Sequence, residues 1–336
     1  MAKAKIIGTG LYAPGEPIDH QELMKLYGIT FDPSKLESKL GYNKRHIAKL
    51  RGINETTADF ATKAAENAIK DAGIDPMDIK LFIVGTDTPE FISPATSVLV
   101  QGRIQGQQQY TGAFDICSSC ASSITALDSA ARMLATDPTL KYAVVVGVYN
   151  MSNFVHNPDG FTAPIFSDGA GAFVLERTED SDPSGYINGL LLSDGTQWDY
   201  IGVYTGGAHR QPTKELIDEG KYGLESLKPL PGDRNVKLWP PIVMDLLKKA
   251  GKKLSDLDHI IFTQINRDVI EKVMENLGLP MEKTTCIMDR YGYTGSGCVP
   301  MAFDVAVKEG RVKKGDTVML IASGSGLTVG SSIFVY

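Results

Sequence analysis

The chain has 336 residues, 43% apolar and 22% charged, enough to bury one large core or two fused cores of about 150 to 180 residues each. Its net charge is -6, and its Lys and Arg residues are scattered singly or in pairs, so we expect no nucleic-acid partner. No stretch approaches the roughly 18 to 20 apolar residues that span a bilayer, and the apolar N-terminus is too short for a signal peptide. We therefore expect a cytoplasmic protein without membrane insertion, its four cysteines free thiols.

Short, β-branched apolar runs alternate with helical segments along the chain. The segment 56–73 begins with threonine caps, keeps apolar residues at helical spacing and stops at Gly73, so it predicts a helix. Continuous apolar runs, typical of strands buried on both faces, lie at 81–86, 142–148, 259–265 and 317–324. This alternation predicts an α/β fold.

An internal repeat indicates that the chain is duplicated. Three stretches recur at nearly equal offsets: 72–84 at 250–262 (178 residues), 126–130 at 302–306 (176), and the strand ending at 147 in the strand ending at 324 (177). The repeat predicts two similar halves, residues 1–180 and 181–336, packed around a pseudo-twofold axis. The loops after equivalent strands would then converge on a shared cleft.

Cys120 is the candidate nucleophile. The run at 112–116 predicts a strand that leads through a tight turn into a buried helix, with Cys120 where the helix begins. Unpaired N–H groups and the helix dipole at such a position are expected to lower the pKa of the thiol. Small neighbours leave room for a substrate carbonyl, whose oxyanion the N–H of Cys120 could hold.

Two other interpretations of Cys120 stay open. A lone cysteine in a helix of small residues is often part of the core, and Cys117-x-x-Cys120 has the spacing of a redox pair or half a metal site. With no second CxxC and no nearby histidine, we expect no metal site. Cys117 is then expected to be structural.

Motifs along nearly the whole chain resemble the β-ketoacyl-acyl-carrier-protein synthase III family of the thiolase superfamily. They are IIGTGLYAP (6–14), GYNKRHIA (41–48), AFDICSSCAS (113–122), FSDGAGAFVL (166–175), DRYGYTGSGCVP (289–300) and GSGLTVGS (324–331). The resemblance implies a five-layered α/β/α/β/α thiolase-like fold and a homodimer, with pocket side chains contributed across the dimer by the loop at 90–94. It also implies transfer of an acyl group from an acyl-coenzyme A or acyl carrier protein thioester to Cys120 and on to an acceptor, in fatty-acid or polyketide type metabolism, with no further cofactor.

The resemblance also assigns binding roles. The oxyanion donors would be the backbone N–H groups of Cys120 and Ser325, and Asn266 lies where relatives contact the pantetheine arm. Lys35 and Lys39 stand where relatives have a tryptophan and an arginine that contact coenzyme A. Lysine attracts phosphate but does not stack as a planar group, so a carrier-protein donor stays open.

Two positions depart from the family pattern. Thr263 and Tyr293 replace the histidine and asparagine that hold the carbonyl oxygen while malonyl loses carbon dioxide. Losing one oxyanion donor typically costs about a hundred- to a thousand-fold in rate, so ordinary malonyl condensation is in doubt. Asp87 lies where the related hydroxymethylglutaryl synthases keep a catalytic glutamate, and Asp87 and Tyr293 are the candidates for handling a proton. A carboxylate in a turn is the alternative for Asp87.

Three functions follow as hypotheses: a synthase III-like ketosynthase with altered residues, a non-decarboxylating acyltransferase to an oxygen, nitrogen, sulfur or carbon nucleophile, and an accessory subunit of a ketosynthase pair. Thiol-disulfide exchange is a more distant fourth. Of the histidines, His46 and His259 are expected to pack in the interior, whereas His156 and His209 lie in loop-like stretches that could reach the cleft.

Overall fold

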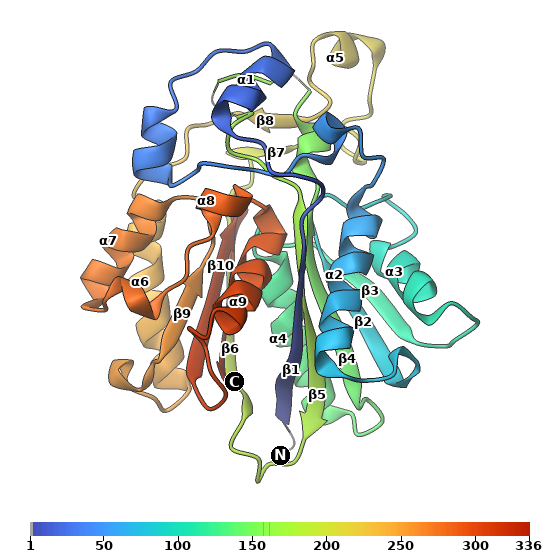
Figure 1. Cartoon of the computed structure of the whole chain (residues 1–336), viewed down its shortest axis with the longest axis vertical. Helices are drawn as coiled ribbons and strands as arrows, with labels where there is room; N and C mark the ends of the chain where they lie inside the picture. Colours follow the sequence, from blue (N-terminus) through green and yellow to red (C-terminus); the bar gives the residue numbers. More distant parts are fainter. Residues whose placement is uncertain (1–2, 157, 161) are drawn as a thin grey trace.

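Two β-sheets form the framework of the protein (Figure 1). The computed structural model describes residues 3–156, 158–160 and 162–336. The first sheet has the order β1-β5-β4-β2-β3 and consists of β1 (Lys3–Tyr12), β2 (Ile79–Gly85), β3 (Gly112–Ile116), β4 (Tyr142–Tyr149) and β5 (Gly169–Thr178). The second has the order β6-β11-β10-β9 and consists of β6 (Gly185–Gln197), β9 (His259–Phe262), β10 (Thr317–Gly324) and β11 (Gly326–Val335).

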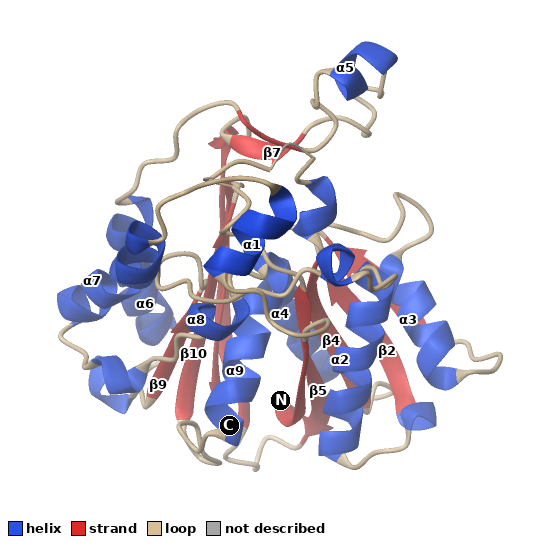
Figure 2. Ribbon diagram, turned by 45° about the horizontal axis from the view of Figure 1, so that its top comes forward, coloured by secondary structure: helices blue, strands red, loops and turns tan. Residues whose placement is uncertain are grey.

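Helices lie between the sheets and on both outer faces, which makes five layers (Figures 1 and 2). Helices α4 (Ser122–Thr136) and α9 (Cys298–Lys308) form the central layer. The outer layers are α2 (Thr57–Ala72) and α3 (Thr96–Gln105) on the first sheet, and α6 (Arg234–Lys249) and α7 (Arg267–Leu277) on the second. The shorter elements are α1 (His20–Tyr27), α5 (Lys214–Asp218), α8 (Met288–Tyr291) and the ribbon of β7 (Ile201–Val203) and β8 (Leu224–Ser226). Of the helices in the described ranges, none is both long and apolar enough to cross a membrane.

The helix α2 confirms the prediction for segment 56–73. Thr56 and Asp59 form a reciprocal capping box at its start, and Gly73 ends it in the left-handed conformation with φ of 66°. The strands β4 and β10 are buried along their whole length, as their continuous apolar runs predict. The run at 259–265 forms a strand only as far as Phe262.

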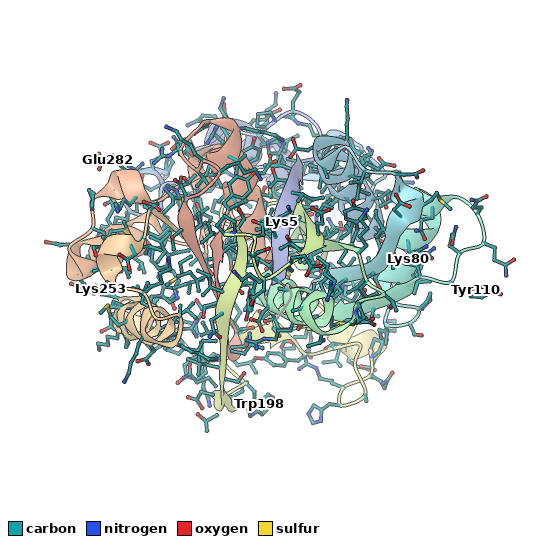
Figure 3. All side chains as sticks on the ribbon, turned by 90° about the horizontal axis from the view of Figure 1, so that it is seen from below. Lys5, Lys80, Tyr110, Trp198, Lys253 and Glu282 are labelled. Atoms are coloured by element: carbon teal, nitrogen blue, oxygen red, sulfur yellow. The ribbon has the colours of Figure 1, made fainter. Side chains whose placement is uncertain are left out.

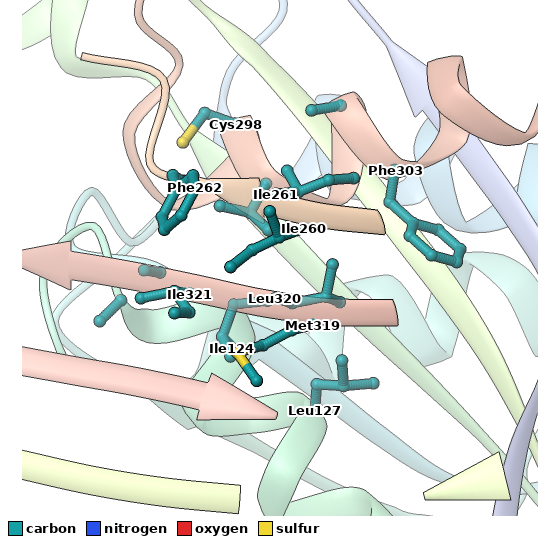
Figure 4. Close-up of a cluster of buried hydrophobic side chains, with 14 of the residues drawn as sticks. Ile124, Leu127, Ile260, Ile261, Phe262, Cys298, Phe303, Met319, Leu320 and Ile321 are labelled. Atoms are coloured by element: carbon teal, nitrogen blue, oxygen red, sulfur yellow. The ribbon is translucent and has the colours of Figure 1, made fainter. Parts of the chain in front are cut away.

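The largest core includes the two central helices, residues of both sheets and the outer helices α6 and α7, and Figure 4 shows the part around β9 and β10. Ile261 and Leu320 from these neighbouring strands, Leu127 of α4 and Phe303 of α9 belong to it, and all four side chains are buried. Burial of each such side chain contributes about 1.5–3 kcal/mol, so the central helices are held firmly against the sheet that carries the C-terminal half of the site.

The two halves 1–180 and 181–336 stay a proposal, which the arrangement of the sheets supports. One sheet is drawn from residues 3–178 and the other from 185–335, with corresponding strand orders. Asp128 of α4 and Asp304 of α9 also match. Asp128 accepts a hydrogen bond from Tyr186 Oη (2.5 Å), Asp304 accepts one from Thr9 Oγ1 (2.7 Å), and each pairs with a cation one turn later on its own helix. Equivalent polar anchors thus tie each central helix to the sheet of the other half.

Candidate active site

A cavity of about 570 Å³ lies where the carboxyl ends of strands from both sheets meet. The first sheet contributes Asp87 after β2, the turn at 117–120 after β3, and Tyr149 at the end of β4. The second contributes the β10–β11 turn at 323–328, with Tyr293 from the loop before α9. The cleft predicted from the repeat is therefore present, and it brings together most of the chemistry-bearing residues.

The β7–β8 ribbon adds an apolar wall that the sequence did not indicate. Ile201, Val203 and Leu224 line the cavity from this ribbon. The segment that carries it follows β6 and includes Trp198, which stands 60% exposed at the edge of the molecule in Figure 3. A mostly apolar lining with a few polar groups is typical of small-molecule sites.

Cys120 lies in a tight turn between β3 and α4. The N–H of Ala121 donates to Ser118 O (3.0 Å), and that of Ser122 donates to Ser119 O (3.0 Å). Ser119 has φ of 50°, the one positive φ outside glycine in the described ranges. A left-handed residue beside a nucleophile is a form of local strain that clusters at functional sites. Here it places Cys120 in the cavity lining.

Gly324 allows the β10–β11 turn to approach this thiol. A Cβ at Gly324 would lie 2.7 Å from the backbone nitrogen of Cys120 and 2.7 Å from Ser119 Cβ. Only glycine leaves room for this contact between the two halves of the site. The turn is short, since β10 ends at Gly324 and β11 begins at Gly326.

The pKa of Cys120 is shifted in the opposite direction to that expected. Burial, reinforced by the nearby Asp87 carboxylate, raises it to about 12, against smaller opposing effects of hydrogen bonds from Tyr293 and Ser119. The expectation of a lowered pKa is wrong because α4 begins at Ser122, two residues beyond the thiol, and because the thiol is enclosed in the cavity. At pH 7 only about one thiol in 10⁵ would be ionised, so a base is needed.

Asp87 has the properties of such a base. Burial raises its pKa to about 6, while hydrogen bonds from Ser119 and Ser296 oppose the shift. Ser119 Oγ donates to Asp87 Oδ2 (3.2 Å), and Ser296 Oγ is 3.4 Å from Oδ1. A carboxylate with a pKa close to neutrality is suited to accept a proton and return it.

Ser119 connects the thiol to this carboxylate. Its Oγ lies 3.8 Å from Cys120 Sγ and 3.2 Å from Asp87 Oδ2. It also accepts a hydrogen bond from the Ser325 N–H (3.2 Å) and lies 3.0 Å from Ser325 Oγ. The Ser325 N–H therefore already has a hydrogen-bond acceptor. To serve as an oxyanion donor, it would have to give up its hydrogen bond to Ser119 Oγ and donate to the substrate oxygen instead.

Tyr293 lines the cavity within a group of aromatic rings. Its ring centroid lies 6.0 Å from that of Tyr149 and 6.1 Å from that of Phe166. Its backbone N–H donates to Ile165 O (3.0 Å), which fixes the loop. Burial raises the pKa of Tyr293 far above its ordinary value, so the phenol stays protonated and acts on Cys120 as a hydrogen-bond donor.

Thr263 and Asn266 are not in the cavity lining. Thr263 is buried, and its Oγ1 accepts a hydrogen bond from the Ser323 N–H (2.8 Å), so it extends the pairing of β9 with β10. Asn266 caps α7, where its Oδ1 accepts from the Val269 N–H (3.2 Å). Both side chains have structural partners instead of facing Cys120.

The remaining expected contacts lie away from the cavity. Lys35 and Lys39 are exposed, at the short helical segment 36–40. His46 and His259 are buried and hydrogen-bonded, as predicted for packing residues. His156 stacks on a tyrosine and His209 is exposed, and neither lines the cavity.

Cys117 and Cys120 are free thiols in this structure. Cys117 is the more exposed of the two, and burial of its sulfur raises its pKa as well. Across residues 3–156, 158–160 and 162–336, no group of three or more His, Cys, Asp or Glu side chains is placed to hold a metal ion. The cavity lining offers two thiols, a carboxylate, hydroxyl groups, and the guanidinium and amide of Arg234 and Asn235.

Comparison with known proteins shows that the chain is similar to 3-oxoacyl-acyl-carrier-protein synthases III. The family model described as 3-oxoacyl-acyl-carrier-protein synthase III matches residues 114–195, and the model of its C-terminal region matches 247–336. The chain is 33% identical over 333 residues to a β-ketoacyl-acyl-carrier-protein synthase III of Coxiella burnetii, covering 99% of both, and 34% identical over 340 residues to one of Xanthomonas campestris, covering 99% and 98%. It superposes on the crystal structure of the Aquifex aeolicus synthase III with a TM-score of 0.83 at 30% identity, covering 99% and 100%.

Proposed function

Because this chain belongs to the 3-oxoacyl-acyl-carrier-protein synthase III family of the thiolase superfamily, a family of acyl-transferring enzymes, we propose that it carries an acyl group as a thioester on Cys120 and passes it to an acceptor without decarboxylation. The donor is an acyl-coenzyme A or acyl carrier protein. The observation that carries the proposal is the hydrogen-bonded path from Cys120 through Ser119 to Asp87.

In the first half-reaction, Cys120 Sγ attacks the carbonyl carbon of the donor thioester. The thiol proton passes to Ser119 Oγ, which releases its own proton to Asp87 Oδ2. A new C–S bond forms to Cys120, the C–S bond to the carrier thiol breaks, and the proton held by Asp87 is returned to the leaving thiolate. General base catalysis of this kind typically contributes about 10²–10⁴-fold, which compensates for the high pKa of the thiol.

In the second half-reaction, the acceptor attacks the acyl group on Cys120. Asp87 is again ionised, takes the proton of the attacking group, and returns it through Ser119 to the Cys120 thiolate as that group leaves. The Tyr293 phenol, which hydrogen-bonds to the thiol, assists the departure of this thiolate. The same carboxylate thus acts first as base and then as acid in each half-reaction.

Two features of the cavity favour transfer without decarboxylation. Thr263 does not line it, so no side chain from that position faces an enolate oxygen. Asp87 places a negative charge beside the reacting atoms, which disfavours the additional negative charge of an enolate. We therefore propose that the acceptor is a nucleophile that attacks through loss of a proton instead of carbon dioxide.

We also propose a homodimer. Phe91 and Ile92 are 51% and 86% exposed in a single chain, and Val98 nearby is 45% exposed. A cluster of exposed large apolar side chains is typical of a protein interface. Light scattering after gel filtration tests this, and a monomer at micromolar concentration would refute it.

The function is tested by following both products of the reaction. Wild type and Cys120→Ala are incubated with a panel of acyl-coenzyme A and acyl carrier protein donors and with carboxyl-labelled malonyl donors. We expect the wild type to release the carrier thiol without releasing labelled carbon dioxide. Release of carbon dioxide in step with the carrier thiol would instead show decarboxylative condensation, and equal thiol release by Cys120→Ala would refute the covalent route.

A further inference from the structure

Arg234 is a cation of the cavity that the proposed reaction does not use. It is the first residue of α6 and lines the same cavity as Cys120. Its Nη1 is buried and has no hydrogen-bond partner within the part of the chain that the structure describes. The groups whose charges act on the guanidinium are the Cys120 thiol and the phenols of Tyr293 and Tyr200, none of them a carboxylate.

Carboxylates close to Arg234 in the chain and in the cavity are engaged elsewhere. Asp233, the preceding residue, pairs with Lys237 (2.5 Å) one turn along the helix. Asp87 is hydrogen-bonded to Ser119 and Ser296. Burial lowers the pKa of Arg234, yet a guanidinium stays charged at neutral pH in proteins. The cavity therefore contains a partly desolvated positive charge, and no carboxylate among the described residues is shown paired with it.

The surroundings of Arg234 extend this positive character. Asn235 lines the cavity beside it, and its Oδ1 accepts a hydrogen bond from Ser323 Oγ (3.2 Å), so its amide N–H groups are the part that can donate to a ligand. Both residues lie in the first turn of a 16-residue helix, where the dipole favours an anion. A guanidinium fork and an amide at a helix start match the planar, bidentate geometry of a carboxylate.

Building on the proposed acyl transfer, we propose that Arg234 and Asn235 bind a carboxylate of the substrate that is retained through the reaction. An enzyme that loses carbon dioxide gains nothing from binding this carboxylate tightly, because the interaction stabilises the ground state and disappears as neutral carbon dioxide forms. The substrate class is an acyl chain or an acceptor that carries a free carboxylate.

The test uses pairs of probes that differ in one charge. Succinyl-coenzyme A is compared with butyryl-coenzyme A for acylation of Cys120, and glycine, glycolate and thioglycolate are each compared with their amides as acceptors from butyryl-Cys120. Iodoacetate is compared with iodoacetamide for alkylation, in which Cys120 Sγ displaces iodide and its proton leaves to solvent. The variants are Arg234→Gln, Arg234→Lys and, as a matched control on the same helix, Lys248→Met, which removes an exposed cation near the end of α6.

We expect the wild type and Lys248→Met to favour the carboxylate member of at least one pair, and Arg234→Gln to lose that preference by about 10- to 100-fold, the range for a charge-assisted hydrogen bond. Arg234→Lys should recover part of it. A preference among the coenzyme A esters places the carboxylate on the acyl chain. A preference among the acceptors places the carboxylate on the acceptor. If no pair shows a preference, or Arg234→Gln keeps it with its thermal unfolding unchanged, the inference is wrong. Alkylation needs no acyl transfer. A preference for iodoacetate in a protein that is not acylated would therefore reject the proposed acyl transfer and leave the carboxylate-binding inference standing.

Discussion

Replacement of Asp87 by asparagine should remove activity and at the same time stabilise the protein at neutral pH. The pKa of Asp87 is raised from its ordinary 3.8 to about 6, and at 1.36 kcal/mol per pH unit this corresponds to about 3 kcal/mol. Because the folded state binds the proton more tightly than the unfolded state, the protonated carboxyl imposes no electrostatic cost below pH 4. The cost develops as the pH rises from about 4 to about 6, and above pH 7 it is complete.

The assay is urea unfolding of wild type and Asp87→Asn at pH 4.5 and pH 8, at one protein concentration. The free energy of unfolding of the variant minus that of wild type should be about 2 kcal/mol larger at pH 8 than at pH 4.5. In parallel, acylation by the wild type should decline as the pH falls through about 6, whereas the variant should be slow at every pH. A stability difference that is the same at both pH values would refute the assignment of a buried, proton-binding carboxylate.

Three further changes test the geometry around the thiol. Ser119→Ala should slow acylation about 100-fold by breaking the path to the carboxylate, and normal activity in this variant would exclude the path. Ser119→Gly should be equally slow, but in urea unfolding it should be about 1 kcal/mol more stable than Ser119→Ala, because glycine adopts the positive φ without strain. Gly324→Ala should cost about 1–3 kcal/mol in thermal unfolding and abolish acylation, since its Cβ would overlap the Cys120 backbone. Tyr293→Phe should slow deacylation at least tenfold in rapid-quench kinetics with little change in stability, and an unchanged rate would exclude the phenol from thiolate departure.

The pattern of apolar runs and the repeat predicted the α/β architecture well because burial on both faces leaves a strong signal in sequence. Strand β4 and helix α2 lie within a residue or two of the predicted segments. The run at 259–265 was less informative. Its last three residues are Thr263, Gln264 and Ile265, which leave the strand, and apolar pattern alone does not show where hydrogen bonding to a neighbour ends.

The candidate site was predicted in part. The motif around Cys120 led to the candidate nucleophile, which lines the cavity together with Asp87 and Tyr293. The direction of the pKa shift of Cys120 was not predictable, because it depends mainly on how closely the thiol is enclosed and also on where α4 begins, two residues further along. The motif identified Thr263 as the residue at the position of the family's histidine. It did not predict where the hydroxyl points, which is set by the hydrogen bond from the Ser323 N–H.

Ser119 and Arg234 were missed for different reasons. Ser119 is one of several small residues in the turn, and only its positive φ and its contacts distinguish it from its neighbours. Arg234 lies in the first turn of an amphipathic helix, where a charged residue is usually solvated, and its place in the cavity depends on how α6 packs against β6 and β11. Neither arrangement leaves a periodic signal in the sequence.

The most direct test of the central claim is peptide mass mapping of the protein after brief incubation with butyryl-coenzyme A. The account predicts one butyryl group per chain, bound to Cys120 as a thioester that hydroxylamine removes, and none on Cys117. An unmodified Cys120, or a butyryl group that persists in Cys120→Ala, would contradict it.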